Sequence, residues 1–496
     1  MASLFKKSIP YQFKDPSLIE TRAFIGGKWL PAMSGKSFPV YDPEDDKEII
    51  SVTNAGRADT SFAIAEAQKA FETYRLTPHR QRRWLMRRWG DLIKASKDDL
   101  AALCTLELGK PFTESLGSVQ YAIDFIDWFE SSVERTLGET IPAARGNNRM
   151  LTIREPQGVV AAITPWNSPL AMVTRKVGAA IAAGNTVVCK PAPETPLCAL
   201  ALAKLFERAG GPPGVLNIIP AGPDTTPEVG EELCHNKLVK HLSFTGSTAV
   251  GKYLNTECAK TIKKTSLELG GNAPFIVFED ADLEEAAKGL VTCKFRSSGQ
   301  TCVCANRILV QASVVDRFAD VLRKCIDDTF IYGSVWDKKV NFGPLYCSKG
   351  VSKARAHLED AVSKGAKLHS GGVSNTDGPN FFAPTIVTES RGNMDFAGEE
   401  TFGPVAFLMP FETEAEAIQR ANDSDVGLAA YFYTQDISRL FRVSEALRVG
   451  MVGARAGLVS AAEGPFGGIQ ESGLGREGGI AALDEYLNVK SITIGI

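Results

Sequence analysis

The strongest constraint on the fold is a regular alternation of apolar extended segments and helical segments between residues 159 and 258. The expected strands cover residues 159–164, 186–190, 215–219 and 239–244, and the expected helices cover 170–183, 196–209, 226–235 and 247–258. This alternation predicts a parallel sheet with right-handed crossovers. Ligands of such sheets bind at the carboxyl ends of the strands, so the residues after each strand are the first candidates for a site.

A second series follows in the same chain. Residues 274–278 and 308–311 are expected strands, and helices are expected from Asp280 and over residues 314–327. The 496 residues exceed what one hydrophobic core usually holds, so we predict a second α/β domain. Residues 135–157 indicate a projecting hairpin and residues 487–494 alternate as a strand. Exposed strands of this kind can pair across subunits, which favours an oligomer.

Composition excludes several classes of protein. The formal net charge of −3 lacks the basic character typical of nucleic-acid binding. Ten scattered cysteines do not resemble a disulfide framework and favour a reducing compartment. The first residues lack a signal-peptide core, and no apolar segment reaches membrane-spanning length. We expect a cytoplasmic protein with neither nucleic acid nor a membrane as partner.

The candidate chemistry lies in two segments, Gly299-Gln300-Thr301-Cys302 and Leu267-Glu268-Leu269-Gly270-Gly271. A cysteine thiolate can attack a carbonyl carbon, and a carboxylate can then deliver water to the acyl-thiol. Cys302 and Glu268 therefore form a minimal acyl-transfer pair. The alternative is that Cys302 is a small buried apolar residue. Cys302 and Cys304 lack further ligands at zinc spacing, so we expect no metal.

Three turns after the expected strands add candidate binding residues. Gly246 and Ser247 follow one strand at a turn into a helix, where backbone amides can bind a pyrophosphate, although an ordinary tight turn fits as well. Lys190 ends another strand and can reach a ribose or simply remain solvated. Asn167 stands between two prolines, where its amide can stabilise an oxyanion or cap the next helix.

Seven motifs occur in the order and spacing of the aldehyde dehydrogenase superfamily, which the chain resembles over nearly its whole length. They are Pro165-Trp166-Asn167, Lys190-Pro191, Phe244-Thr245-Gly246-Ser247, Leu267-Glu268-Leu269-Gly270-Gly271, Gly299-Gln300-Thr301-Cys302, Glu400-Thr401-Phe402-Gly403-Pro404 and Pro465-Phe466-Gly467-Gly468.

The resemblance implies an α/β subunit of three parts. A Rossmann-like parallel-sheet cofactor domain covers residues 1–133 and 156–266, an α/β catalytic domain covers 267–477, and a β oligomerisation arm of a homodimer or homotetramer covers 134–155 and 478–496. It also implies oxidation of an aldehyde to an acid with NAD or NADP. Cys302 would be the nucleophile, Glu268 the general base and Asn167 an oxyanion donor. The implied cofactor residues are Trp166, Lys190, Pro193, Gly246, Ser247, Glu400 and Phe402.

Four further segments carry a narrower resemblance: Met172-Val173-Thr174-Arg175-Lys176, Lys294-Phe295-Arg296, Gln300-Thr301-Cys302-Val303-Cys304 and Gly457-Leu458-Val459-Ser460. With these segments the chain resembles the succinate-semialdehyde dehydrogenases. This resemblance implies that Arg175, Arg296 and Ser460 bind a substrate carboxylate, and that Cys304 can form a redox pair with Cys302. A helix-surface ion pair is the alternative for Arg175. Two positions depart from the pattern of that branch. Ser168 stands where the branch usually has an aromatic residue, and Arg455 lies in a segment whose sequence differs from the branch. An uncharged or larger aldehyde is therefore the alternative substrate. A non-catalytic scaffold is a third possibility, against which the four motif residues Cys302, Glu268, Asn167 and Lys190 argue.

The resemblance also bears on cofactor choice: NAD-preferring relatives have a glutamate three residues after the lysine of the Lys-Pro motif. Here that position is Pro193, although the adjacent Glu194 could take its place. Loss of a carboxylate there removes a charge repulsion with the 2′-phosphate of NADP worth about 1 kcal/mol or more. Both NAD and NADP therefore remain expected cofactors.

Overall fold

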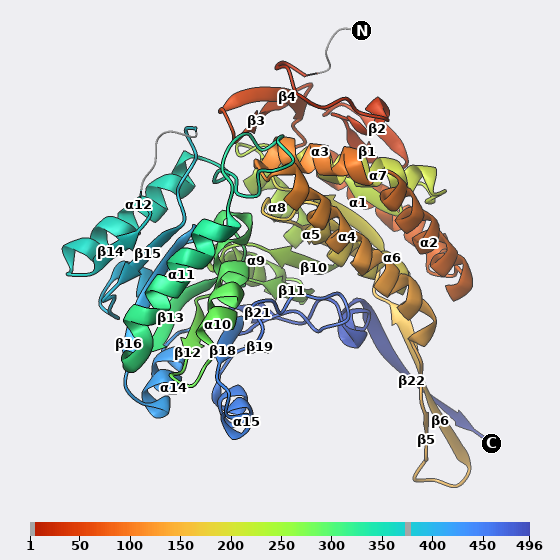
Figure 1. Cartoon of the computed structure of the whole chain (residues 1–496). Coiled ribbons are helices and arrows are strands. Elements are labelled where there is room, and N and C mark those ends of the chain that lie inside the picture. The colour runs from red at the N-terminus through yellow and green to blue at the C-terminus, as the bar shows by residue number, and fades with distance from the viewer. Residues whose placement is uncertain (1–4, 373–377) are drawn as a thin grey trace.

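The computed structural model describes residues 5–372 and 378–496. Two lobes, each built around a sheet covered by helices, lie side by side, and a thin β arm projects from one of them (Figure 1). The chain's C-terminus lies on this arm (Figure 1).

Within the described residues, eight strands form the sheet of the first lobe in the order β2-β1-β9-β8-β7-β10-β11-β21. Its five central strands are parallel: β7 (Val159–Ile163), β8 (Thr186–Lys190), β9 (Leu216–Ile218), β10 (Val239–Thr245) and β11 (Lys264–Glu268). The chain proceeds outward from β7 in one direction and then from β10 in the other. The strand order therefore reverses between β7 and β10, which is where doubly wound sheets bind ligands.

The crossovers of this sheet are helical, as the alternation predicts. They are α5 (Ala171–Val173) and α6 (Ala179–Ala183), α7 (Pro196–Arg208), α8 (Thr226–His235) and α9 (Thr248–Ala259). The expected helix over residues 170–183 is interrupted by a π-helical turn at Thr174–Gly178. Such wide turns often occur at functional sites, and this one carries Arg175.

The N-terminal segment forms two separate strand pairs and then a run of helices. The hairpin of β1 (Ala23–Ile25) and β2 (Lys28–Leu30) extends the large sheet by pairing with β9. Strands β3 (Ser37–Asp42) and β4 (Lys47–Thr53) pair separately. Helices α1 (Arg57–Tyr74), α2 (His79–Ala95), α3 (Lys97–Leu108) and α4 (Phe112–Ser132) follow.

The second lobe contains the predicted second α/β series. Seven strands of the described part form its sheet in the order β14-β15-β16-β13-β12-β18-β19. They are β12 (Ala273–Val277), β13 (Ala305–Gln311), β14 (Lys367–Ser370), β15 (Thr385–Thr388), β16 (Val405–Phe411), β18 (Ala429–Tyr433) and β19 (Met451–Ala454). The helices are α10 (Leu283–Leu290), α11 (Val315–Thr329), α12 (Ser348–Ser363), α13 (Asp395–Gly398), α14 (Glu414–Asn422) and α15 (Ile437–Ala446).

Two connections join the lobes. Strand β21 (Gly473–Leu474) returns to the first sheet and pairs with β11, and β17 (Val426–Gly427) pairs with β20 (Ile469–Gln470). Because β11 ends at Glu268 and β12 starts at Ala273, the chain passes from one sheet to the other in a few residues. The carboxyl end of the first sheet therefore faces the second lobe.

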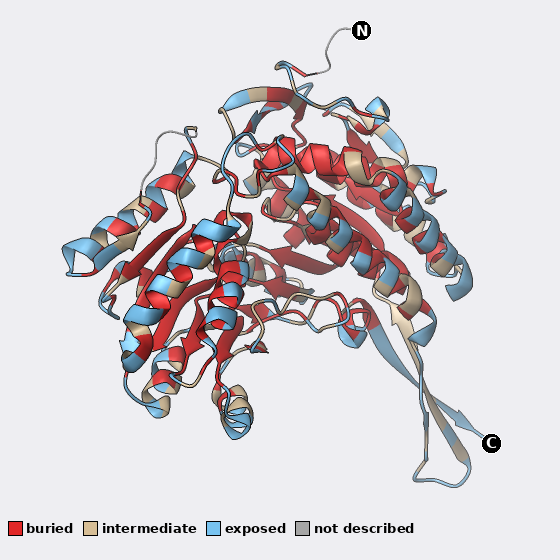
Figure 2. Cartoon of the chain, in the orientation of Figure 1, coloured by how far each residue is buried: buried red, intermediate tan, exposed pale blue. Residues whose placement is uncertain are grey.

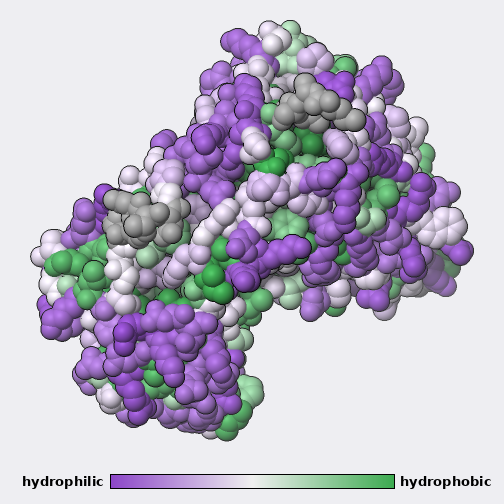
Figure 3. Space-filling model, turned by 45° about the horizontal axis from the view of Figure 1, so that its top comes forward, coloured by the Kyte–Doolittle hydropathy of each residue, from purple (hydrophilic) through white to green (hydrophobic). Residues whose placement is uncertain are grey.

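The arm combines segments that are far apart in the sequence. Strands β5 (Thr140–Ile141) and β6 (Asn148–Pro156) form the predicted hairpin, and β22 (Leu487–Gly495) pairs with β6 over its whole length. Figure 2 shows the strands of the two lobes buried and the arm half-buried or exposed. Figure 3 shows a largely hydrophilic surface, with hydrophobic residues mainly in its recessed parts. Among the described helices, none combines the length and the apolar character that crossing a bilayer requires.

Candidate active site

Cys302 lies where two cavities meet. The first cavity, of about 460 Å³, is lined by one face of α4 together with Arg175, Arg296 and Ser460. The second, of about 400 Å³, is lined by residues that follow β7 and β10 and by the 400–402 segment. Cys302 and Asn167 line both cavities. A molecule in either cavity can therefore reach the same sulfur.

The loop that carries Cys302 is held by specific contacts. Ser297 and Ser298 adopt left-handed backbone conformations, with φ of 52° and 53°. The Glu114 carboxylate accepts hydrogen bonds from both the amide and the hydroxyl of Ser297, each 2.8 Å long. At Gly299 (φ 78°) an added Cβ would lie 2.4 Å from the carbonyl oxygen of Gly403. Strained loops of this kind are typical of functional sites, and here the strain fixes the approach to Cys302.

Glu268 ends β11 and is buried beside the thiol. Arg175 Nη2 donates to Glu268 Oε2 at 3.2 Å, and the Arg175 guanidinium also pairs with the carboxylate of Glu477. Glu477 pairs in addition with Lys176. All four side chains are at least nine-tenths buried, so two cations and two carboxylates balance within one cluster. The helix-surface ion pair that was the alternative for Arg175 is therefore wrong, because this pair lies in the interior.

Burial sets the protonation of the reacting groups. It raises the pKa of the Cys302 thiol well above its usual value; the Glu268 carboxylate adds to this rise, and Arg175 opposes it. Burial also raises the pKa of Glu268, again against Arg175. A base whose pKa is raised toward neutrality is better suited to take a proton from water. Arg175 is the cation that opposes the rise in the pKa of Cys302.

Asn167 follows β7 and is buried next to the same loop. Its Nδ2 donates to the carbonyl of Gln300 at 3.0 Å, and Lys110 Nζ donates to the carbonyl of Asn167 at 3.2 Å. These bonds fix both the side chain and the backbone of Asn167. The amide lies in the walls of both cavities, as an oxyanion donor must.

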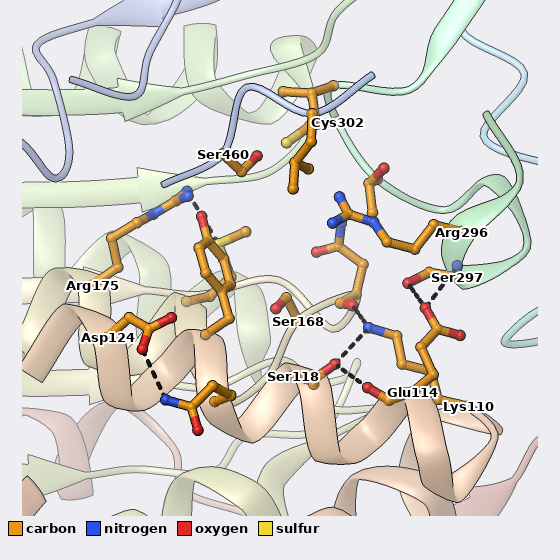
Figure 4. Close-up of a pocket in the computed structure, with 18 of the residues that line it drawn as sticks. Lys110, Glu114, Ser118, Asp124, Ser168, Arg175, Arg296, Ser297, Cys302 and Ser460 are labelled. Carbon is orange, nitrogen blue, oxygen red and sulfur yellow. Dashed lines mark hydrogen bonds between the residues drawn. The ribbon is translucent and has the colours of Figure 1, made fainter. Parts of the chain in front are cut away.

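The first cavity has two arginines in its wall (Figure 4). Figure 4 shows Arg175 and Arg296 on opposite sides, Cys302 and Ser460 together, and Glu114, Ser118 and Asp124 along α4. Arg296 forms no salt bridge with any described residue, so its charge is available to a ligand. Ser168 also lines this cavity, whereas Arg455 donates to the carbonyl of Thr434 at 2.6 Å.

The second cavity contains five of the predicted cofactor residues: Trp166, Gly246, Ser247, Glu400 and Phe402. Ser247 caps the N-terminus of α9, where backbone amides favour phosphate. Glu400 Oε1 is buried and finds no partner among the described residues, and burial raises the pKa of Glu400 to about 8. A carboxyl oxygen without a partner and a helix N-terminus in the same cavity fit, respectively, the ribose hydroxyls and the phosphates of a dinucleotide.

The other two predicted cofactor residues lie apart from these five. Lys190 is buried, its ammonium donates to the carbonyl of Pro191 at 3.2 Å, and burial lowers its pKa to about 8. Pro193 lines a third cavity with Glu194 and Lys349, and Lys349 lines the second cavity too. Pro193 therefore lies in a cavity that adjoins the second one at Lys349, whereas the lining of neither cavity includes Lys190.

Cys304 is turned away from the cavities. It is buried, and its sulfur lies 2.8 Å from the Thr301 hydroxyl and 3.8 Å from the carbonyl of Lys294. All ten cysteines are free in the structure. A bond between Cys302 and Cys304 would require the loop to rearrange. Across the described residues, no three His, Cys, Asp or Glu side chains gather as a metal site would need.

Several functional side chains escape sequence reasoning. Glu477 pairs with Arg175 although it follows it by 302 positions, and no local sequence pattern predicts this contact. The wall on α4 does have a signal, because its polar residues recur every three or four positions, which places them on one helix face. These residues are Glu114, Ser118, Tyr121 and Asp124.

A doubly wound sheet with a cysteine shared by a crevice at its switch point and by a second cavity is the arrangement that a thiol-dependent oxidoreductase needs. Comparison with known proteins agrees. The sequence model of the aldehyde dehydrogenase family matches residues 29–492. The chain belongs to the aldehyde dehydrogenase family, and the predicted family and fold class are confirmed.

Individual relatives cover almost the whole chain. A Schizosaccharomyces pombe protein named succinate-semialdehyde dehydrogenase (NADP(+)) 1 is 52% identical, over 97% of each chain. A glutarate-semialdehyde dehydrogenase of Pseudomonas putida is 49% identical, over 98% of this chain and 100% of that one. The crystal structure of succinate-semialdehyde dehydrogenase from Burkholderia pseudomallei superimposes with a TM-score of 0.96 at 46% identity, over 98% of this chain and 100% of that one.

Proposed function

We propose that this enzyme oxidises succinate semialdehyde to succinate with NAD or NADP, through a thioester on Cys302. One observation carries the chemistry: the sulfur lies at the junction of two cavities, with a buried carboxylate beside it. The relatives named for semialdehydes support the substrate. A non-catalytic scaffold would not require a cysteine between two cavities, which argues against that alternative.

In this mechanism the Cys302 sulfur adds to the aldehyde carbon from the first cavity. The thiol gives up its proton to the Glu268 carboxylate beside it, which returns that proton to solvent before the hydrolysis step. The resulting oxyanion accepts hydrogen bonds from the Asn167 amide and the Cys302 backbone N–H. The dinucleotide, when bound, supplies the hydride acceptor. Glu268 then removes a proton from the water that cleaves the thioester, and the product leaves as a carboxylate.

The second cavity is proposed as the dinucleotide site. Glu400 would accept from ribose hydroxyls, Ser247 and the start of α9 would hold the pyrophosphate, and Trp166, Gly246 and Phe402 would shape the path. Lys190 and Pro193 would stand near the other ribose. Because a proline occupies position 193, no carboxylate at that position repels a 2′-phosphate, which supports use of NADP as well as NAD.

The first cavity supports a substrate with a carboxylate. Arg296 offers an uncompensated guanidinium and Ser460 a hydroxyl, and guanidinium groups bind carboxylates with paired hydrogen bonds. Arg175 contributes from its buried cluster. Glutarate semialdehyde is a second candidate, because Ser168 leaves more room than an aromatic residue would and two relatives of nearly half identity bear that name.

Initial rates of NADH and NADPH formation test this assignment. The wild type should prefer succinate semialdehyde over butanal, which has the same chain length and no charge. Arg296→Ala should lose roughly 10- to 100-fold of this preference, the value of a charged hydrogen-bonded contact. Arg391→Ala, at an exposed arginine of the same lobe, is the matched control. Equal rates with both aldehydes in the wild type would refute the assignment.

We further propose that the arm joins subunits into a homodimer or homotetramer. Strand β22 is an edge of the three-stranded arm, and its apolar residues Val489 and Ile494 are 58% and 47% exposed; such a free edge can pair with a second chain. A chain ending before Leu487 should sediment as a smaller species than the full chain, and an unchanged sedimentation coefficient would disprove the role of β22. The free thiols support a reducing location such as the cytoplasm. The domain boundaries at residues 134, 156, 267 and 478 remain a prediction.

A further inference from the structure

The wall of the first cavity opposite Cys302 is one face of α4. Glu114, Ser118, Tyr121 and Asp124 lie on this face at helical spacing. Their polar groups differ in one respect that matters for binding: most of them already have partners within the protein, and one does not.

Three of these four side chains already form hydrogen bonds within the protein. Glu114 accepts both hydrogen bonds from Ser297. Ser118 Oγ accepts from Lys110 Nζ at 3.3 Å, and Asp124 Oδ1 accepts from Gln120 Nε2 at 2.9 Å. These bonds hold the wall and the Cys302 loop in place. They leave these side chains with less capacity for a ligand.

The Tyr121 hydroxyl is the exception. It is buried and forms no hydrogen bond with any described residue. The neighbouring Arg175 donates from its Nη2 to Glu268 and to the sulfur of Met172, both at 3.2 Å. Its guanidinium also lies close enough to the phenol to lower the pKa of Tyr121, but without the geometry of a hydrogen bond. Buried hydroxyl groups in proteins are almost always hydrogen-bonded, so this one has capacity for a partner that enters the cavity.

The charges around the first cavity indicate which kind of ligand the Tyr121 hydroxyl can bind. Arg175 and Lys176 are balanced by Glu268 and Glu477. Lys110 and Arg296 line the first cavity without a salt bridge to any described residue, but the Lys110 ammonium is already bonded to Ser118 and to the carbonyl of Asn167, so the Arg296 guanidinium is the cation left for a ligand. Burial raises the pKa of the Tyr121 phenol, against the effect of Arg175. The phenol is thus neutral at physiological pH and can donate its proton to an anion.

Resting on the proposed function, we infer that Tyr121 is a substrate-positioning residue whose hydroxyl donates a hydrogen bond to the carboxylate of the semialdehyde, together with Arg296 and Ser460. This assigns to α4 a direct part in substrate selection. The carboxylate would be bound by three donors from three separate segments of the chain, of which only the Arg296 guanidinium is charged.

The test is Tyr121→Phe, which removes only the hydroxyl. For succinate semialdehyde, KM should rise roughly 10-fold with kcat nearly unchanged, since a hydrogen bond to a charged group is lost. For butanal, kcat/KM should not change. Succinate, as a product inhibitor, should bind Tyr121→Phe more weakly by the same factor. Tyr74→Phe is the matched control, because it deletes a buried hydroxyl that is bonded to the carbonyl of Ile181 outside the cavity.

The outcomes separate this inference from the proposed function. If the wild type prefers succinate semialdehyde and Tyr121→Phe keeps that preference, Tyr121 does not bind the carboxylate. Equal losses with both aldehydes, or a changed pH dependence of Cys302 alkylation, would assign Tyr121 to the thiol and overturn the inference. A wild type without any preference would refute the proposed function itself, and the inference with it.

Discussion

At the residue scale, the protonation of Cys302 has a direct consequence. Burial and the Glu268 carboxylate raise the pKa of the thiol well above its usual value, so at neutral pH the free enzyme holds a thiol. The thiolate fraction grows only as the pH rises. Alkylation by iodoacetamide should therefore keep accelerating from pH 7 to beyond the usual thiol pKa of about 8.5.

Peptide mapping of the alkylated protein follows Cys302 alone among the ten cysteines, and Cys302→Ala gives the background. A rate that is already constant between about pH 7 and pH 8, as for an activated thiolate with a depressed pKa, would contradict the structure of the free enzyme.

The buried cluster makes a second prediction with a definite sign. The charge of Glu477 raises the pKa of Glu268, and Arg175 lowers it. Glu477→Gln removes a negative charge and should lower the pKa of Glu268. The acid limb of the pH profile for thioester hydrolysis should then move to lower pH, with a slower maximum because the base is weaker. Single-turnover kinetics across pH measure this shift.

The exposed pair of Glu471 and Lys252, 2.6 Å apart, provides the control for this change. Glu471→Gln removes the same charge from the surface, where solvent screens it. An equal shift in both variants, or a shift of the Glu477→Gln profile to higher pH, would contradict the proposed coupling.

At the element scale, much of the fold follows from local pattern. The expected ranges for β8 and α8 match the structure at both ends, and the other crossover elements match within one or two residues, with residues 170–183 divided by the π-turn. Long apolar strands and capped helices can be predicted because the residues that determine them are adjacent in the sequence. The π-helical turn at Thr174–Gly178 could not be predicted, because the sequence of residues 170–183 is that of an ordinary apolar helix.

Packing between α10 and β18 gives a test at this scale. A Cβ at Gly289 would lie 1.8 Å from the Tyr433 hydroxyl, so Gly289→Ala must displace the ring or the helix. Overpacking typically costs about 1–3 kcal/mol, and we expect thermal unfolding a few degrees lower. Gly350→Ala on α12, where the nearest atom is 3.6 Å away, should leave the melting temperature unchanged or raise it. Equal melting temperatures for the two variants would show that the α10 contact is not tight.

At the scale of the whole molecule, the candidate site depends on contacts that no local pattern reveals. Cys302, Glu268 and Asn167 could be named from motifs, and the structure brings them to one junction. The partners that set their pKa values come from elsewhere: Arg175 from the interrupted helix and Glu477 from the segment before the arm. Only the packing of both lobes creates that cluster, so sequence alone could not assign its charges.

The pairing of strands in the arm also could not be predicted from local sequence patterns. The arm's hairpin and terminal strand were each predictable from alternation and turn residues. The ladder that pairs β22 with β6 in a single chain joins segments more than three hundred residues apart, and the sequence left open whether such strands pair within a subunit or between subunits.

The most direct test of the central claim is intact-protein mass spectrometry of Glu268→Gln after mixing with succinate semialdehyde and NAD or NADP. Without the base, hydrolysis should slow by roughly 10²- to 10⁴-fold, so the protein should gain the mass of one succinyl group per chain, mapped to Cys302, with about one equivalent of reduced cofactor formed before turnover stalls. Because Glu268 also accepts the thiol proton, this first turnover should be slower than that of the wild type. Cys302→Ala in the same background should show neither the adduct nor the reduced cofactor. Steady turnover of Glu268→Gln at the wild-type rate, or an adduct on another residue, would contradict a mechanism in which Cys302 forms the thioester and Glu268 cleaves it.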